Sequence, residues 1–107
     1  MDRPPYGVIV LTTVGASFDA HSFARTLVER GLCACVNVLP GVESIYRWKN
    51  AIESDAEQLL VIKTIDSSLD ALESAVRELH PYEVPEFVVI RMDEVRGAYQ
   101  DWLFHGK

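Results

Sequence analysis

The densest group of chemically useful side chains in this sequence lies in residues 80–86, His-Pro-Tyr-Glu-Val-Pro-Glu. These residues place an imidazole, a phenol and two carboxylates within one short segment. Pro81 and Pro85 fix φ near about −65° and push the residues before them towards extended conformations, so the segment cannot continue a helix. A stiff connector of this kind either binds something small or only turns a tight corner.

His80 is the residue of this connector with the most versatile chemistry. It follows an amphipathic segment and stands at the end of an expected helix, where the negative end of the helix dipole favours a protonated imidazole. His80 can therefore cap that helix, or it can act as a ligand together with Glu83 or Glu86. Both roles stay open at this point.

Two thiols form a second candidate site. On a strand, Cys33 and Cys35 would lie on one face with about 6.6–7 Å of rise between them, which suits a disulfide poorly. Two sulfurs on one face can hold copper(I), or zinc with further ligands, but structural zinc sites commonly use two-residue gaps between cysteines. The alternative is that both are small reduced thiols that fill the interior of the sheet.

Two further groups lie on the expected strands. Residues 46–49, Tyr-Arg-Trp-Lys, alternate aromatic and cationic side chains near the tip of an expected hairpin, as a contact surface or as cross-strand packing. Glu57 and Lys63 flank the apolar part of the returning strand. They either frame a polar pocket or are solvated strand ends.

The composition predicts one globular domain over residues 1–107. The net charge of −6 opposes binding to nucleic acid and to anionic membrane surfaces, and it tolerates cationic partners. The longest apolar runs are too short to cross a bilayer, and residues 1–5 do not form a basic leader. We therefore expect a cytoplasmic protein that binds neither nucleic acid nor membrane.

The order of elements that must position these groups is βαββαβ followed by a short helix. Strands are expected at residues 6–13, 33–48, 58–64 and 86–92, and helices at 19–31 and 67–80 and around residues 99–103. Pro40 and Gly41 predict a bulge or a bend within the second strand, and Asn50 marks the reversal of the hairpin. Right-handed crossovers then give an α+β, ferredoxin-like split βαβ fold: a four-stranded antiparallel sheet with both main helices on one face.

This arrangement leaves one face of the sheet uncovered. The first, third and fourth strands carry apolar residues on both faces, yet two helices cover only one. An exposed patch of several hundred Å² would forgo on the order of 10 kcal/mol at about 25 cal/mol per Å². We therefore predict a homo-oligomer whose sheets face inward.

Several functional classes lack their required parts. The sequence contains no Gly-x-Ser-x-Gly elbow, no phosphate-binding Gly-x-x-x-x-Gly-Lys loop and no His-Glu-x-x-His helix. The loop at residues 14–16 carries no arginine, which argues against an acylphosphatase. The basic, aromatic sheet motif of an RNA-recognition domain is absent as well.

The chain resembles the CutA family of divalent-cation tolerance proteins in a series of blocks that occur in order. The blocks are residues 27–37 with Pro40 and Gly41, and residues 44–48, 62–64, 80–86 and 99–103. The resemblance implies a homotrimer of ferredoxin-like protomers, related in architecture to PII signalling proteins, and a binder rather than an enzyme. It also makes Cys35 and His80 candidate metal ligands. Thr12 replaces a thiol that some relatives carry, and Asn50 stands where a glycine is common.

The sequence therefore predicts a cytoplasmic homotrimer that tolerates divalent metal ions by binding them weakly. The candidate ligands are Cys35, His80 and Glu86, and copper or zinc is a ligand that the fold does not require. A first alternative is a PII-like sensor whose cleft between subunits, lined by Trp48, Lys63 and Tyr82, binds a small molecule. A second is a trimeric structural scaffold that presents a surface to an unknown protein partner.

Overall fold

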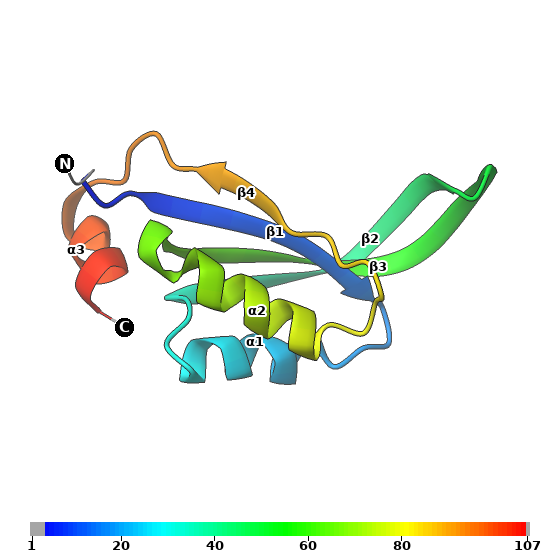
Figure 1. The fold of residues 1–107 in the computed structure, drawn as a ribbon, viewed down its shortest axis with the longest axis horizontal. Helices are drawn as coiled ribbons and strands as arrows, with labels where there is room; N and C mark the ends of the chain where they lie inside the picture. Colours follow the sequence, from blue (N-terminus) through cyan, green and yellow to red (C-terminus); the bar gives the residue numbers. More distant parts are fainter. Residues whose placement is uncertain (1–3, 107) are drawn as a thin grey trace.

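An antiparallel sheet forms the long axis of the molecule in the computed structural model, which describes residues 4–106 (Figure 1). Over this range the strands are β1 (Gly7–Gly15), β2 (Cys35–Trp48), β3 (Ala51–Ile65) and β4 (Val88–Arg91). They lie in the order β2-β3-β1-β4, and every neighbouring pair is antiparallel. The ferredoxin-like topology predicted from the order of elements is confirmed.

The two main helices cover one face of this sheet. They are α1 (Ala20–Glu29) and α2 (Leu69–Leu79), and α2 is entered through a 3₁₀ turn, η1 (Asp66–Ser68). Asp19 caps α1, because its carboxylate accepts hydrogen bonds from the backbone N–H and the hydroxyl of Ser22, both at 3.0 Å. A third helix, α3 (Gly97–His105), lies at the end of the sheet where β1 begins (Figure 1). No helix among the described residues has the length and hydropathy of a membrane span.

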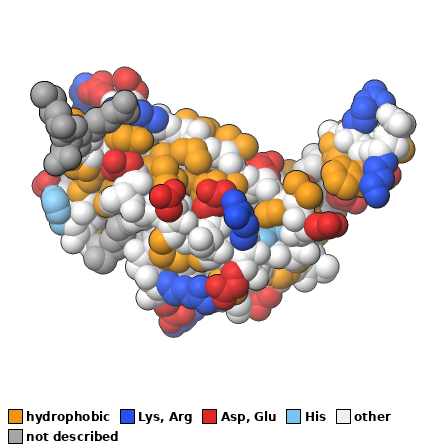
Figure 2. All heavy atoms as spheres, in the orientation of Figure 1, with side chains coloured by type: hydrophobic (Ala, Val, Ile, Leu, Met, Phe, Trp, Pro, Cys, Tyr) orange, Lys and Arg blue, Asp and Glu red, His pale blue; other side chains and the backbone are white. Residues whose placement is uncertain are grey.

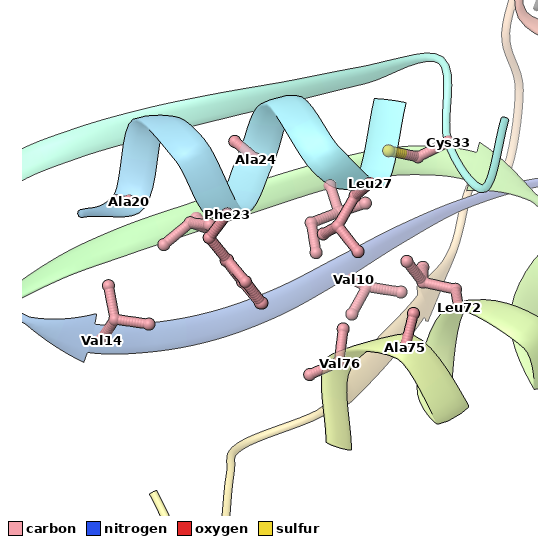
Figure 3. Close-up of a cluster of buried hydrophobic side chains, with 12 residues drawn as sticks. Val10, Val14, Ala20, Phe23, Ala24, Leu27, Cys33, Leu72, Ala75 and Val76 are labelled. Carbon is pink, nitrogen blue, oxygen red and sulfur yellow. The ribbon is translucent and has the colours of Figure 1, made fainter. Parts of the chain in front are cut away.

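The hydrophobic core fills the space between the helices and the sheet, as Figure 3 shows. Val10 and Val14 of β1 point towards this space, where Leu27 of α1 and Leu72 and Val76 of α2 meet them. These five side chains are at most 1% exposed. At about 1.5–3 kcal/mol for each fully buried side chain, this layer holds both helices against the sheet.

The opposite face of the sheet is apolar but has no helix over it (Figure 1). Leu11 of β1 pairs with Val61 of β3 on one side and with Val88 of β4 on the other, so the three side chains share this face. Val88 is 47% exposed, and its neighbour on this face, Ile90, is 44% exposed. The two-faced apolar character expected from the sequence is therefore present in the protomer.

The β2–β3 hairpin extends beyond the body of the molecule (Figure 1). Lys49 and Asn50 form its turn with φ of 49° and 66°, the left-handed region that a tight hairpin turn requires. Figure 2 shows lysine, arginine and hydrophobic side chains at the tip. β3 begins at Ala51, well before the predicted segment 58–64, because pairing with β2 makes strand of a polar stretch that has no strand pattern of its own.

A bulge in β2 interrupts its regular pairing with β3. Leu39 pairs with Leu59, but the next pair along the ladder is Val42 with Glu57, so β2 contains an extra residue at this point. Gly41 takes up the distortion with φ of 76°. The bulge predicted at Pro40 and Gly41 is confirmed.

Candidate functional site

The imidazole of His80 joins the end of α2 to the end of β1. His80 is the C-cap residue of α2, and its backbone N–H donates to the carbonyl of Val76 at 2.8 Å. In the ring, Nδ1 accepts the N–H of Tyr82 at 3.1 Å, so Nε2 carries the hydrogen and donates it to the carbonyl of Thr13 at 2.8 Å. Both ring nitrogens therefore have partners within the protomer.

His80 is neutral in this position. Its side chain is buried, and this burial lowers the pKa of the ring although the Thr13 carbonyl and the charge of Glu57 act in the opposite direction. The position at the end of a helix favours a protonated imidazole, but burial acts in the opposite direction and is the larger effect here. The corner-turning role of the connector is plain from these contacts.

A tyrosine–glutamate pair lies next to His80. The hydroxyl of Tyr82 donates to Oε2 of Glu57 at 2.5 Å, and the rings of Tyr82 and His80 are 4.9 Å apart between centroids. Glu57 lies in β3 opposite Gly15 of β1 and is only 6% exposed. Burial, and then the bond to Glu57, raise the pKa of Tyr82 above its usual value, so the phenol stays a donor.

A cleft of about 900 Å³ opens beside this pair, between the end of β1, the hairpin and the 80–86 connector. Four carboxylates are among the described residues that line it, from Asp55, Glu57, Glu83 and Glu86. Its described lining contains no lysine or arginine. Burial raises the pKa of the Glu86 carboxyl, and the charge of Glu57 raises it further. The cleft is therefore a region of negative potential that favours cations.

Aromatic rings form a second part of the lining. Tyr46 and Trp48 of the hairpin lie on the same side as Glu57, because they pair with Glu53 and Ala51, which alternate along β3 in step with Glu57. Tyr82 adds a third ring from the connector. The hydroxyl of Tyr46 donates to the carboxylate of Asp55, and this bond is the main cause that raises the pKa of Tyr46 to about 12.

The comparison with known proteins identifies the family. The family described as "CutA1 divalent ion tolerance protein" matches residues 8–105. The chain belongs to the CutA1 family. A divalent-cation tolerance protein CutA from Thermus thermophilus is 44% identical over 95 residues, which are 89% of this chain and 92% of that protein.

Solved CutA1 structures share the fold. The structure from Thermus thermophilus has a TM-score of 0.87 at 43% identity and covers 92% of this chain and 95% of its own. The structure from Oryza sativa also has a TM-score of 0.87, at 38% identity, over 92% of this chain and 90% of its own. The resemblance drawn from the sequence blocks is confirmed.

Some CutA relatives are much longer proteins. This chain spans 56% of a CutA homologue from Xenopus laevis and 54% of a chloroplastic CutA from Oryza sativa. The names of the Thermus relative and of the family describe tolerance to divalent cations and name no reaction. These relatives are therefore named as tolerance proteins and not as enzymes, which agrees with the binder that the resemblance implied.

The three candidate metal ligands do not meet in one CutA1 protomer. Cys35 pairs with Lys63, which pairs with Ile9, whereas His80 contacts Thr13 four positions further along β1. At about 3.3 Å per residue, roughly 13 Å of strand separates these two positions on β1. Glu86 lines the cleft near His80. Among residues 4–106, no group of three or more histidine, cysteine, aspartate or glutamate side chains is placed to hold a metal ion.

The two thiols lie on opposite faces of the sheet. Cys33 precedes β2 and is fully buried in the core under the helices (Figure 3). Val36 packs against the same core. Cys35 belongs to the other face, since it pairs with Lys63 while Val36 pairs with Ile62. The prediction that both thiols share a face is wrong, because the chain reaches β2 through a bend and becomes a regular strand only at Cys35. Cys33 instead matches the alternative prediction, a small thiol that fills the interior.

Two of the three residues predicted to bind a small molecule in the sensor alternative lie together. Trp48 and Tyr82 both line the cleft, whereas Lys63 lies further along the face of β3 that carries Glu57 and is not part of this lining. A polar pocket was one of two possibilities predicted for Glu57, and the structure places it in the cleft, but the pairing of Tyr46 with Asp55 was not predicted. The register counted from the turn at Asn50 would have placed Tyr46 and Asp55 on one face.

Proposed function

We propose that this chain acts in tolerance to divalent cations as a homotrimer that binds the metal ion weakly and catalyses no reaction. The observation that carries the proposal is the cleft, whose described lining holds four carboxylates and no lysine or arginine. Family membership supports the same class of ligand. Copper and zinc are the ions that we propose, and the cytoplasm is the proposed location.

Weak binding follows from the number and type of ligands. Glu57 and Glu86 interact through their charges, so a divalent cation between them would relieve their repulsion. Two carboxylates with water completing the shell hold such an ion far less tightly than a closed set of four protein ligands. Cys35 and His80 stay in the proposal as ligands that would have to join from another subunit, or after His80 gives up its bond to Thr13.

Calorimetric titration with copper(II) and zinc tests the ligands. We expect Glu86→Gln and Glu57→Gln each to lower the affinity severalfold, while Glu29→Gln on the exposed side of α1 serves as the matched control. His80→Ala and Cys35→Ser measure what the other two ligands predicted from the sequence contribute to the affinity. Absence of uptake by the wild-type protein would refute metal binding, and equal affinity in all the variants would refute the proposed ligands.

The homotrimer is supported by the apolar face that no helix covers. Leu11, Val61 and Val88 lie side by side there, and burying them against copies of the chain would recover their hydrophobic free energy. Sedimentation velocity at micromolar concentration should show one species with three times the protomer mass. Leu11→Lys should dissociate it, and a wild-type monomer would contradict the proposal.

A PII-like sensor of small molecules is the second candidate. The observation that favours it is the aromatic lining from Trp48, Tyr82 and Tyr46, which a hydrated metal ion does not need. In this reading Lys63 would have to reach the cleft from a neighbouring subunit. A protein that takes up neither metal nor small molecule would instead support the trimeric scaffold with a protein partner.

A further inference from the structure

The cleft combines a buried carboxylate with exposed aromatic rings, and this combination selects a particular kind of ligand. Glu57 is only 6% exposed, whereas Trp48 is 50% exposed and Tyr46 is 40% exposed. All three line the same cleft. The cleft therefore combines a desolvated carboxylate with aromatic rings that solvent can reach.

Glu57 lacks a counter-ion within the described part of the chain. Its hydrogen-bond donor is the neutral hydroxyl of Tyr82, and the ion pairs among residues 4–106 involve other carboxylates. The ring of His80 senses the charge of Glu57, but burial lowers its pKa and its Nδ1 accepts the N–H of Tyr82, so it is not a counter-ion. A buried carboxylate is costly unless a positive charge compensates it, so a cation that enters the cleft gains a strong interaction.

The rings extend this preference to organic cations. An ammonium group within about 6 Å of a tryptophan or tyrosine ring is attracted by the negative face of the ring. A cation lies near the Trp48 ring in the protomer itself, since the ammonium of Lys49 is 5.9 Å from its centroid, and Trp48 remains 50% exposed. A cleft of about 900 Å³ is also far larger than a metal ion requires, and it suits a small molecule.

We infer that the cleft binds a small organic cation, with its ammonium group between the Glu57 and Glu86 carboxylates and the rings of Tyr46, Trp48 and Tyr82. The inference rests on the proposed function as a cation-binding cleft, and it adds a ligand class that depends on the aromatic wall. A metal ion uses only the carboxylates. The two ligands can therefore be separated by changing a ring.

Calorimetric titration of the intact protein with choline tests this inference. The matched neutral probe is 3,3-dimethylbutan-1-ol, which has the shape of choline without its charge. We expect choline to bind at least about tenfold more tightly than the neutral probe, because the charge contributes to every contact described above. Equal affinity for the two probes, or no binding of choline, would overturn the inference.

Variants of the two tryptophans then locate the site. Trp48→Ala should weaken choline binding about tenfold and leave zinc affinity unchanged, while Trp102→Ala on the exposed side of α3 should change neither. Trp48→Phe, which keeps an aromatic face, should give an intermediate affinity and guards against a folding defect in Trp48→Ala. Unchanged choline affinity in Trp48→Ala overturns the aromatic site. Loss of zinc binding alone would count against the metal proposal and not against this one.

Discussion

Removing the hydroxyl of Tyr82 tests whether the acidic end of the cleft is held by a hydrogen bond to a buried charge. Tyr82→Phe deletes the donor that lies 2.5 Å from Oε2 of Glu57. The ring remains, so the contact with the His80 ring and the backbone bond from Tyr82 to Nδ1 of His80 are kept. The variant therefore isolates a single hydrogen bond.

The expected loss follows from the burial of the two partners. A hydrogen bond to a charged group contributes about 1.5–3 kcal/mol, but Tyr82 is 38% exposed and water can replace part of the bond. We therefore expect the free energy of unfolding to fall by about 1–2 kcal/mol at pH 7. Because the pKa of Tyr82 is raised, this stabilisation is complete below about pH 10 and is lost only as the pH rises above that value.

Urea unfolding at a fixed protomer concentration measures the change, since association would otherwise alter the apparent stability. Tyr46→Phe is the matched control: it removes the same kind of bond, to Asp55, from the exposed hairpin. Its effect should be much smaller. If Tyr82→Phe and Tyr46→Phe differ by less than about 0.5 kcal/mol, the burial of Glu57 does not control the strength of these bonds and the argument fails.

Three further predictions each concern a single residue. Burial lowers the pKa of His80, so the contribution of the neutral ring to stability is present above about pH 6.5 and is lost as the pH falls through the lowered pKa. Urea unfolding between pH 7 and pH 5 should show this decline in the wild type and not in His80→Gln. The pKa of Glu86 is raised, so the ionised carboxylate lowers the stability of the protein at pH 7. Glu86→Gln should therefore raise the melting temperature measured by calorimetry at pH 7, and an unchanged or lower melting temperature would contradict this. Gly31 has φ of 72°, and an added Cβ there would meet open space, so only backbone strain opposes a substitution. Urea unfolding should show a free energy of unfolding about 1 kcal/mol lower for Gly31→Ala and a smaller loss for Gly31→Asn.

Much of the fold could be predicted because its signals are local. Asp19 caps α1, Gly31 follows its end, and Pro40 with Gly41 marks the bulge in β2, each through the backbone preference of one or two residues. The uncovered apolar face was predicted from side chains that alternate along single strands. The length of β3 was missed, because residues 51–57 become strand only through their partners in β2.

The candidate site was harder to predict because residue types do not give directions. His80 has the right chemistry for a metal ligand, but its two nitrogens are directed to Thr13 and Tyr82. Cys33 and Cys35 have the spacing of one strand face, but the strand begins only at the second of them. In both cases the deciding contact comes from a segment distant in sequence or from a bend with no strong signal.

The aromatic wall of the cleft follows from the regular pairing at the tip of the hairpin, and the bulge in β2 has a different consequence. Glu57 pairs with Val42, on the same side of the bulge as Tyr46 and Trp48, so these side chains share a face through an uninterrupted alternation along β2 and β3. Before the bulge, the odd-numbered residues of β2, such as Cys35, lie on this face, because a shift of one residue exchanges the two sides of a strand. The local distortion predicted from a proline and a glycine therefore decides that the thiol of Cys35 lies on the face of the cleft. The acidic and aromatic parts of the cleft, and the cation chemistry proposed for it, depend instead on the turn that sets the register of the hairpin tip.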